Sequence, residues 1–119
     1  MEQAFDISLV LRRQPERRTL AAGEPLFFEH QTGAEMFAVI SGRIDVLTYG
    51  KVLEQIGPGG VLGEMALIDE GPRSAAALAA EASEVAVIPR ALFLALVKEE
   101  PAFALHVMRV LAGRLRRRG

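Results

Sequence analysis

The run from Gly59 to Ala75, GGVLGEMALIDEGPRSA, constrains the fold more than any other part of the chain. Its paired glycines allow a sharp bend, or a close approach of the backbone to a ligand. The apolar residues after Glu64 predict a short helix between two strands, whose first amide groups, near Glu64 to Ala66, would be free to bind an anion. Arg73 adds a fork of charged donors and Ser74 adds a hydroxyl. A group with one phosphate and a neighbouring sugar hydroxyl would satisfy all of them.

This run resembles the phosphate-binding cassette of cyclic nucleotide-binding domains, such as those of catabolite activators and of protein kinase A regulatory subunits. The resemblance rests on GEMAL at 63–67 and PRSA at 72–75, with a weaker match at 39–44, and it extends over about residues 20–115. It implies that Glu64 holds a ribose 2'-hydroxyl and that Arg73 holds a cyclic phosphate, assisted by helix-start amides and the residue after the arginine. The ligand-binding residues predicted in this way are Gly63, Glu64, Met65, Ala66, Arg73, Ser74 and Ala75.

Each of these polar residues also has an ordinary structural interpretation. A single arginine such as Arg73 is usually a surface ion pair, and Glu64 could simply favour a helix N-terminus. Ser74 could cap a strand. Their occurrence together in one glycine-rich run favours the binding site over these separate interpretations.

Composition limits the other classes of function. The 119 residues fit one domain, and 50% are hydrophobic, which predicts a folded core. The net charge of −1 gives no reason to expect nucleic acid, and the absence of cysteine excludes disulfides and thiol chemistry. His30 and His106 have no second histidine at metal-ligand spacing, so we expect no metal, unlike in metal-dependent cupins. With no apolar run of membrane-spanning length and no signal sequence, we expect no membrane partner and a cytoplasmic protein.

The strand pattern predicts a mainly β fold. Short apolar segments with connections of a few residues indicate a jelly-roll-like barrel of eight strands, a double-stranded β-helix, with helices at both ends. We expect a single domain over 1–119. Its parts are an N-terminal helix at about 3–13, a barrel at about 17–89 that includes the cassette at 62–75, and C-terminal helices at about 90–117.

The last predicted helix is apolar on two faces. One stripe contains Phe103, Val107, Val110 and Leu111, and the other contains Leu105, Met108, Ala112 and Leu115. Such a helix covers the barrel and something else, either a bound base or a second subunit in a homodimer. In the family that this chain resembles, the corresponding helix closes over the base as a lid, and an arginine on it can stack on the purine. The spacing of the arginines in this chain does not show which of them would do so. The final arginines at 116–118 could contact nucleic acid or acidic lipid, although a solvated helix end is the preferred interpretation.

The resemblance implies reversible binding of cyclic AMP or cyclic GMP, with no cofactor and no catalysis. Serine rather than threonine after the arginine leans slightly toward cyclic AMP. The expected mechanism is a population shift in which the ligand draws the cassette and the C-terminal helix together, which a separate effector protein would detect. We expect either a stand-alone receptor or part of a longer protein. Two alternatives are a ligand-free protein-interaction module, which intact Glu64 and Arg73 disfavour, and a jelly-roll enzyme, which the missing metal ligands disfavour.

Overall fold

The computed structural model describes residues 5–69 and 71–118. The strands in that part of the chain are β1 (Arg17–Leu20), β2 (Pro25–Phe27), β3 (Glu35–Ser41), β4 (Ile44–Thr48), β5 (Lys51–Ile56), β6 (Val61–Leu62), β7 (Ala76–Ala79) and β8 (Ser83–Pro89). The helices are α1 (Ser8–Leu11), α2 (Met65–Ile68), α3 (Arg90–Glu99) and α4 (Pro101–Arg118).

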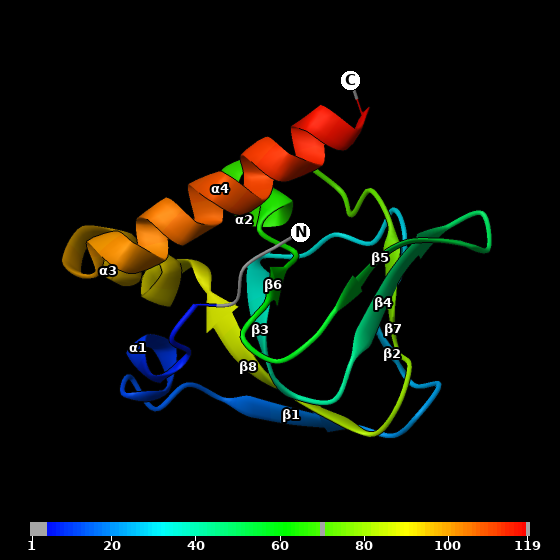
Figure 1. Ribbon diagram of the computed structural model, residues 1–119, viewed down its shortest axis with the longest axis horizontal. Coiled ribbons are helices and arrows are strands. Elements are labelled where there is room, and N and C mark those ends of the chain that lie inside the picture. The colour runs from blue at the N-terminus through cyan, green and yellow to red at the C-terminus, as the bar shows by residue number, and fades with distance from the viewer. Residues whose placement is uncertain (1–4, 70, 119) are drawn as a thin grey trace.

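The strands form two antiparallel four-stranded sheets, in the orders β1-β8-β3-β6 and β2-β7-β4-β5 (Figure 1). The predicted mainly β class with flanking helices is confirmed. The predicted barrel is confirmed only in part, because the strands of the described residues do not join into one closed sheet. Each sheet keeps its own pairing, and the chain crosses between the sheets through turns.

One of these turns lies at Gly42, between β3 and β4. The two strands do not form a hairpin, because β3 pairs with β6 and β8, whereas β4 pairs with β5 and β7. Gly42 has φ of +85°, and a Cβ atom on it would clash with Ser83 Oγ and approach Ala82 O to 2.5 Å. Glycine therefore allows a sharp corner that carries the chain from one sheet to the other.

The first sheet is the middle layer of the molecule, and β3 shows why its sequence is almost wholly apolar. Met36 and Ala38 point toward the helices, while Phe37 and Val39 point toward the second sheet. Strand β8 alternates in the same way, with Ala86 and Ile88 toward the helices and Val85 and Val87 toward the second sheet. Successive side chains on a strand face opposite sides, so a sheet covered on both faces needs apolar residues at nearly every position.

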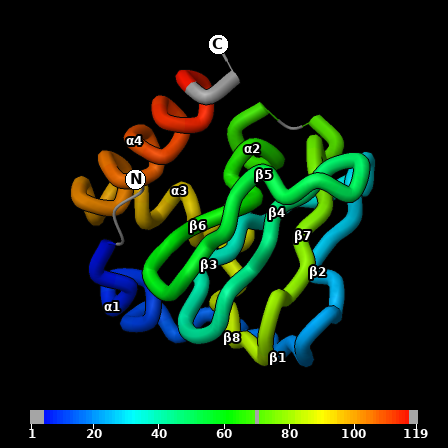
Figure 2. Tube along the Cα trace, turned by 45° about the vertical axis from the view of Figure 1, so that its right-hand side comes forward, coloured from blue at the N-terminus to red at the C-terminus, as the bar shows by residue number. Residues whose placement is uncertain are grey.

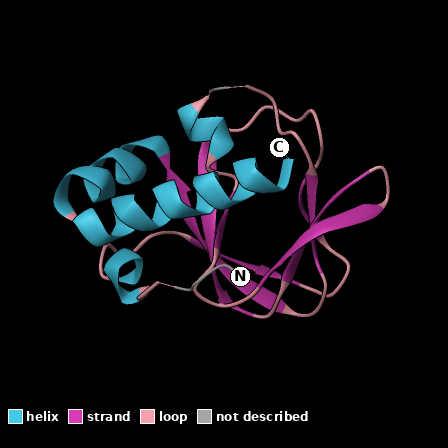
Figure 3. Ribbon diagram, turned by 45° about the horizontal axis from the view of Figure 1, so that its top comes forward, coloured by secondary structure: helices cyan, strands magenta, loops and turns pink. Residues whose placement is uncertain are grey.

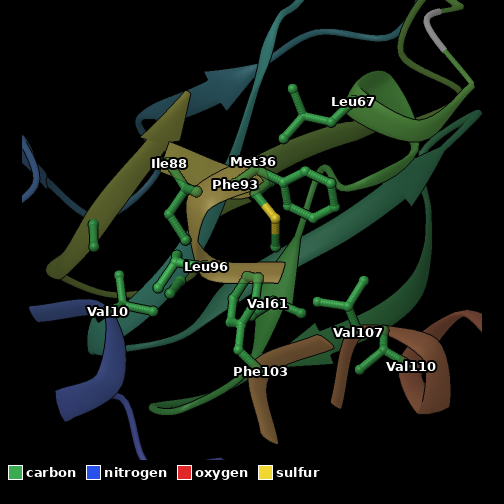
Figure 4. Close-up of a cluster of buried hydrophobic side chains, with 12 residues drawn as sticks. Val10, Met36, Val61, Leu67, Ile88, Phe93, Leu96, Phe103, Val107 and Val110 are labelled. Atoms are coloured by element: carbon green, nitrogen blue, oxygen red, sulfur yellow. The ribbon is translucent and has the colours of Figure 1, made fainter. Parts of the chain in front are cut away.

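The helices gather on the outer face of this middle sheet (Figures 1 and 3). Figure 4 shows the core between them, in which Met36 from the sheet meets Phe93 and Leu96 of α3 and Phe103 of α4. The side chains of Met36, Leu96 and Phe103 have no exposed surface. Helix α4 thus has a well-anchored N-terminal half, and its other half continues past β6 toward α2 (Figure 2).

The N-terminal helix is shorter than predicted. It was expected over about 3–13 but spans Ser8–Leu11, and residues 1–4 lie outside the described part. Asp6 Oδ1 accepts a hydrogen bond at 3.0 Å from the amide of Ser8, the first residue of the helix. Gln14, with φ of +51°, turns the chain away before Pro15. The helices expected over about 90–117 are seen as α3 and α4, separated at Glu100 because a residue before proline disfavours the helical conformation.

Candidate nucleotide-binding site

The predicted site residues line one cavity of about 360 Å³. Strands β2, β4 and β5, the cassette and α4 contribute to its walls. Among the lining residues are all seven residues predicted from the sequence: Gly63, Glu64, Met65, Ala66, Arg73, Ser74 and Ala75. Their roles in binding stay predictions, but the fold brings them together around a single space.

Arg73 is buried, with 6% of its surface exposed. Its Nη1 donates to Gly63 O at 3.0 Å, and its Nη2 donates to Glu35 O at 2.8 Å. Its guanidinium carbon lies 4.3 Å from the ring centroid of Phe27, close enough for a cation–π contact. The side chain is therefore fixed from several directions by the protein itself.

The charge of Arg73 is nevertheless not neutralised by a direct partner. No described carboxylate lies within ion-pair distance of it, and its Nε is a buried donor without a hydrogen-bond acceptor. Burial lowers the pKa of Arg73, although Glu35 and Glu64 act at longer range in the opposite direction. A buried cation with an unused N–H group favours the approach of an anion.

Glu64 is also buried, with 2% of its surface exposed, and it pairs with the C-terminal helix. Arg114 Nη1 donates to Glu64 Oε1 at 2.6 Å. The same arginine forms a fork on Glu54 of β5, with Nε–Oε1 and Nη2–Oε2 distances of 2.9 and 3.2 Å, and its Nη2 also donates to Val61 O at 2.9 Å. Burial opposes the charge of Arg114, but the two carboxylates outweigh burial and raise the pKa of Arg114 above its usual value. We call this arrangement of Glu54, Arg114 and Glu64 the helix bridge.

The remaining predicted residues occupy different parts of the wall. Ala66 and Ala75 are buried, Met65 is 38% exposed, and Ser74 is exposed. Gly63 has φ of +81°, which favours glycine, and its carbonyl holds Arg73. The predicted free amides are corrected in one position, because the amide of Ala66 donates to Gly63 O at 3.3 Å within the turn.

Sequence reasoning did not select Arg114, although a signal was present. Phe103, Val107 and Val110 are the buried stripe of α4, and the next position in that series of steps of four and three residues is 114. An arginine on an otherwise buried stripe indicates a charge with a specific partner. Glu54 and Phe27 gave no comparable signal, because both lie in strands that form the wall only after folding.

Two other kinds of site were sought in the part of the chain that the structure describes. There, no three or more histidine, aspartate or glutamate side chains come close enough to hold a metal ion. Across residues 5–69 and 71–118, no helix combines the length and the apolar character needed to cross a membrane.

Known proteins resemble this chain in sequence. Residues 17–100 match the family model described as the cyclic nucleotide-binding domain. The chain is 36% identical over 106 residues to the cyclic AMP receptor protein of Thermus thermophilus, an alignment covering 85% of this chain and 49% of that protein. It is 26% identical over 112 residues to the CRP-like cAMP-activated global transcriptional regulator of Mycobacterium tuberculosis, covering 90% of this chain and 50% of that protein. The chain thus spans about half the length of these relatives.

Solved structures of known proteins also resemble this chain in fold. The Thermus thermophilus catabolite activator protein superposes with a TM-score of 0.81 at 35% identity, covering 93% of this chain and 54% of that one. A structure described as "A cyclic-GMP-dependent signalling pathway regulates bacterial phytopathogenesis" superposes with a TM-score of 0.79 at 28% identity, covering 98% of this chain and 96% of that one.

Proposed function

Because this chain belongs to the cyclic nucleotide-binding domain family, we propose that it reversibly binds cyclic AMP or cyclic GMP in the cavity around Arg73 and Glu64. The observation that carries the proposal is the buried guanidinium of Arg73. It is held by carbonyl oxygens and an aromatic ring, and it still has an unused donor at Nε.

The placement of the ligand follows from the chemistry of the wall. The cyclic phosphate lies against Arg73, where an anion supplies both the missing charge and an acceptor for Nε. The ribose lies toward Glu64, whose carboxylate accepts a hydrogen bond from the 2'-hydroxyl. The base then extends toward the more exposed wall, which includes Val52, Leu53 and Met65. No cofactor or metal is part of this proposal.

Cyclic AMP and cyclic GMP are both supported as candidate ligands by similar proteins. The relative from Thermus thermophilus is named a cyclic AMP receptor, whereas a similar structure is described in terms of cyclic GMP signalling. Ser74 is exposed at the cavity wall and offers one hydroxyl, which can both donate and accept. We therefore propose the two cyclic purine nucleotides as competing ligands.

Helix α4 is the element through which binding would be signalled. Arg114 joins α4 to the cassette residue Glu64, so a ligand that engages Glu64 changes the surroundings of the helix end. Such a ligand favours whichever position of α4 it binds more tightly, which is a population shift. A separate effector protein that recognises α4 would detect the change. A cytoplasmic receptor without catalytic activity is part of the same proposal.

The exposed stripe of α4 supports a homodimer as a further part of the proposal. Leu105, Met108 and Leu115 are 44%, 58% and 66% exposed, and with Ala112 they repeat at alternating steps of three and four residues. This is the spacing of a coiled-coil seam, in which two copies of a helix bury such side chains against each other.

Isothermal titration calorimetry with cyclic AMP and with cyclic GMP tests the central proposal. We expect saturable heat with at least one nucleotide, and none with the Arg73→Ala variant. The absence of heat and of thermal stabilisation with both nucleotides would favour the ligand-free interaction module. Hydrolysis of either nucleotide on prolonged incubation would favour the enzyme alternative.

A further inference from the structure

Gly33 lies in the loop between β2 and β3, and this loop is tied to the backbone of Arg73. The amide of His30 donates to Arg73 O at 2.7 Å, and the amide of Arg73 donates to Gln31 O at 2.9 Å. These two hydrogen bonds fix the loop relative to the arginine. The next residues of the loop therefore lie at a defined place beside the guanidinium.

The space at Gly33 is occupied by the guanidinium of Arg73. A Cβ atom added to Gly33 would lie 2.5 Å from Nη2, 2.6 Å from Nε and 2.7 Å from the guanidinium carbon. Real Cβ atoms essentially never show non-bonded contacts this short, so either the alanine or the arginine would have to move. The clash falls on the edge formed by Nε and Nη2, which includes the unused donor at Nε.

Arg73 cannot move aside without losing contacts. Its Nη1 and Nη2 are bound to the carbonyls of Gly63 and Glu35, and its guanidinium lies over Phe27. A side chain at position 33 would therefore break one or more of these contacts.

The requirement at position 33 is for space rather than for a special backbone conformation. The glycines with positive φ are Gly23, Gly42, Gly50, Gly59 and Gly63 among the described residues, and Gly33 is not one of them. Residue 33 is therefore outside the positive-φ region in which an alanine would be strained. Gly63 also lies close to Arg73, but its φ is +81°. Any substitution there would add backbone strain to the steric clash, so Gly63 is not suitable for testing the clash alone.

We propose that Gly33 is a positioning residue for phosphate binding, whose missing side chain leaves the room that the guanidinium of Arg73 needs to keep its place at the cavity. This inference rests on the proposed function, because it assigns Gly33 a role in the same phosphate site. It also makes a separate statement about the arginine in the ligand-free protein.

The first test compares Gly33→Ala with Gly57→Ala by calorimetric titration of cyclic AMP and cyclic GMP. Gly57 is the matched control, because a Cβ there meets nothing within 4 Å and its φ is not positive. We expect Gly33→Ala to weaken binding roughly 10- to 100-fold, the effect of losing one charge-assisted hydrogen bond. Gly57→Ala should bind like the wild type. Equal affinities of wild type and Gly33→Ala would overturn the proposal.

A second background separates positioning from a general effect on folding. Lysine at position 73 has no Nε–Nη2 edge, so adding Gly33→Ala to Arg73→Lys should weaken binding much less than it does in the wild type. An equal loss in both backgrounds, or a drop in melting temperature that accounts for the lost binding, would overturn the role of Gly33.

The third test does not need a nucleotide. In proton–nitrogen NMR spectra of the ligand-free protein, the Nε–H signal of Arg73 can be assigned by its disappearance in Arg73→Lys. We expect Gly33→Ala to shift this signal and Gly57→Ala to leave it unchanged. If the wild type binds neither nucleotide, the proposed function fails, and this signal still decides whether Gly33 positions the arginine. An unchanged Nε–H signal would overturn the positioning role.

Discussion

At the scale of single residues, the site contrasts two buried arginines. Arg114 is neutralised by carboxylates, whereas Arg73 is held by carbonyl oxygens and an aromatic ring. Carbonyl oxygens satisfy N–H groups without supplying a negative charge. Of the two, Arg73 is therefore the one that a phosphate would neutralise, and Arg114 is the one that already has its counter-charge.

Removal of the Arg73 side chain should nearly abolish binding. Arg73→Ala should weaken cyclic nucleotide binding by roughly 100- to 10,000-fold, because a charge in a partly dry pocket loses about 3–5 kcal/mol without its partner. Arg73→Lys should also bind more weakly, since a point charge replaces a planar fork. Calorimetry measures both, and an affinity of Arg73→Ala within threefold of the wild type would contradict the phosphate role.

Glu64→Gln should weaken binding less than the loss of Arg73, since one charge-assisted hydrogen bond contributes about 1.5–3 kcal/mol. The helix bridge divides this loss into two parts. The part due to the ribose should disappear with 2'-deoxy cyclic AMP, and the part due to Arg114 should remain. Titrations of the wild type and of Glu64→Gln with cyclic AMP and with 2'-deoxy cyclic AMP measure the two parts. If the loss were the same on the two ligands, Glu64 would act only through Arg114.

At the scale of elements, α4 joins the folded core to the site. Its first half is anchored by Phe103, Val107 and Val110, and its last turns reach the cavity through Arg114. The anchored half gives the helix a fixed direction. The end is held mainly by polar contacts, which exchange for water at less cost than buried apolar surface does.

Breaking the helix bridge should release nucleotide faster. In Arg114→Ala, and after removal of residues 113–119, we expect a higher dissociation rate with a smaller change in the association rate, because differences between close variants arise mostly in dissociation. Stopped-flow displacement of a fluorescent cyclic nucleotide measures both rates. Arg116→Ala is the control, since Arg116 is exposed on the same helix end. A dissociation rate unchanged in Arg114→Ala would exclude the lid role of this segment.

The exposed stripe of α4 makes a prediction about assembly. We expect a dimer whose population rises with protein concentration, and Met108→Asp should shift it to the monomer by placing charges in the seam. Phe28→Asp is the matched control, because Phe28 and Met108 are both 58% exposed and Phe28 belongs to the β2–β3 loop. Light scattering after size-exclusion chromatography measures the mass. A wild-type monomer at all concentrations would contradict the homodimer.

The elements show how far the sequence could be interpreted. The short apolar strands, the short cassette helix and the two faces of α4 could all be predicted, because each depends on local sequence patterns. The two separate sheets, the corner at Gly42 and the space at Gly33 could not, since they depend on which strands pair and on what lies opposite a glycine. For the same reason, Arg73 was found from its neighbours in the chain, whereas Glu54 required the fold.

At the scale of the whole molecule, His106 is a buried base in the layer of helices. Its surface is 7% exposed, and its ring stacks on that of Phe5 with the ring centroids 4.7 Å apart. Its Nε2 is buried and has no hydrogen-bond partner. Burial first, and then Arg109 and Arg114, lower the pKa of His106 below its usual 6.5. The folded protein therefore favours the neutral imidazole, and its stability depends on pH.

The sign follows from proton uptake. Below about pH 6.5 the unfolded chain binds a proton at position 106 before the folded protein does, so stability falls as the pH drops toward the lower folded-state value. We expect the wild type to lose more stability between about pH 7 and about pH 5 than His106→Gln, as measured by urea unfolding. His30→Asn, at a side chain that is 82% exposed, should behave like the wild type. If the free energy of unfolding changed with pH by the same amount in the wild type and in His106→Gln, this prediction would be contradicted.

The helix bridge has a consequence for any partner protein that binds α4. Under the proposed function, the position of the helix end and the affinity for nucleotide are linked through Glu64 by one coupling free energy, and such coupling is reciprocal. A partner that captures α4 only when Arg114 has left Glu64 must lower the affinity for nucleotide by the same factor by which nucleotide lowers the affinity for the partner. The sensitivity of this receptor would then be set partly by the concentration of the protein that it controls.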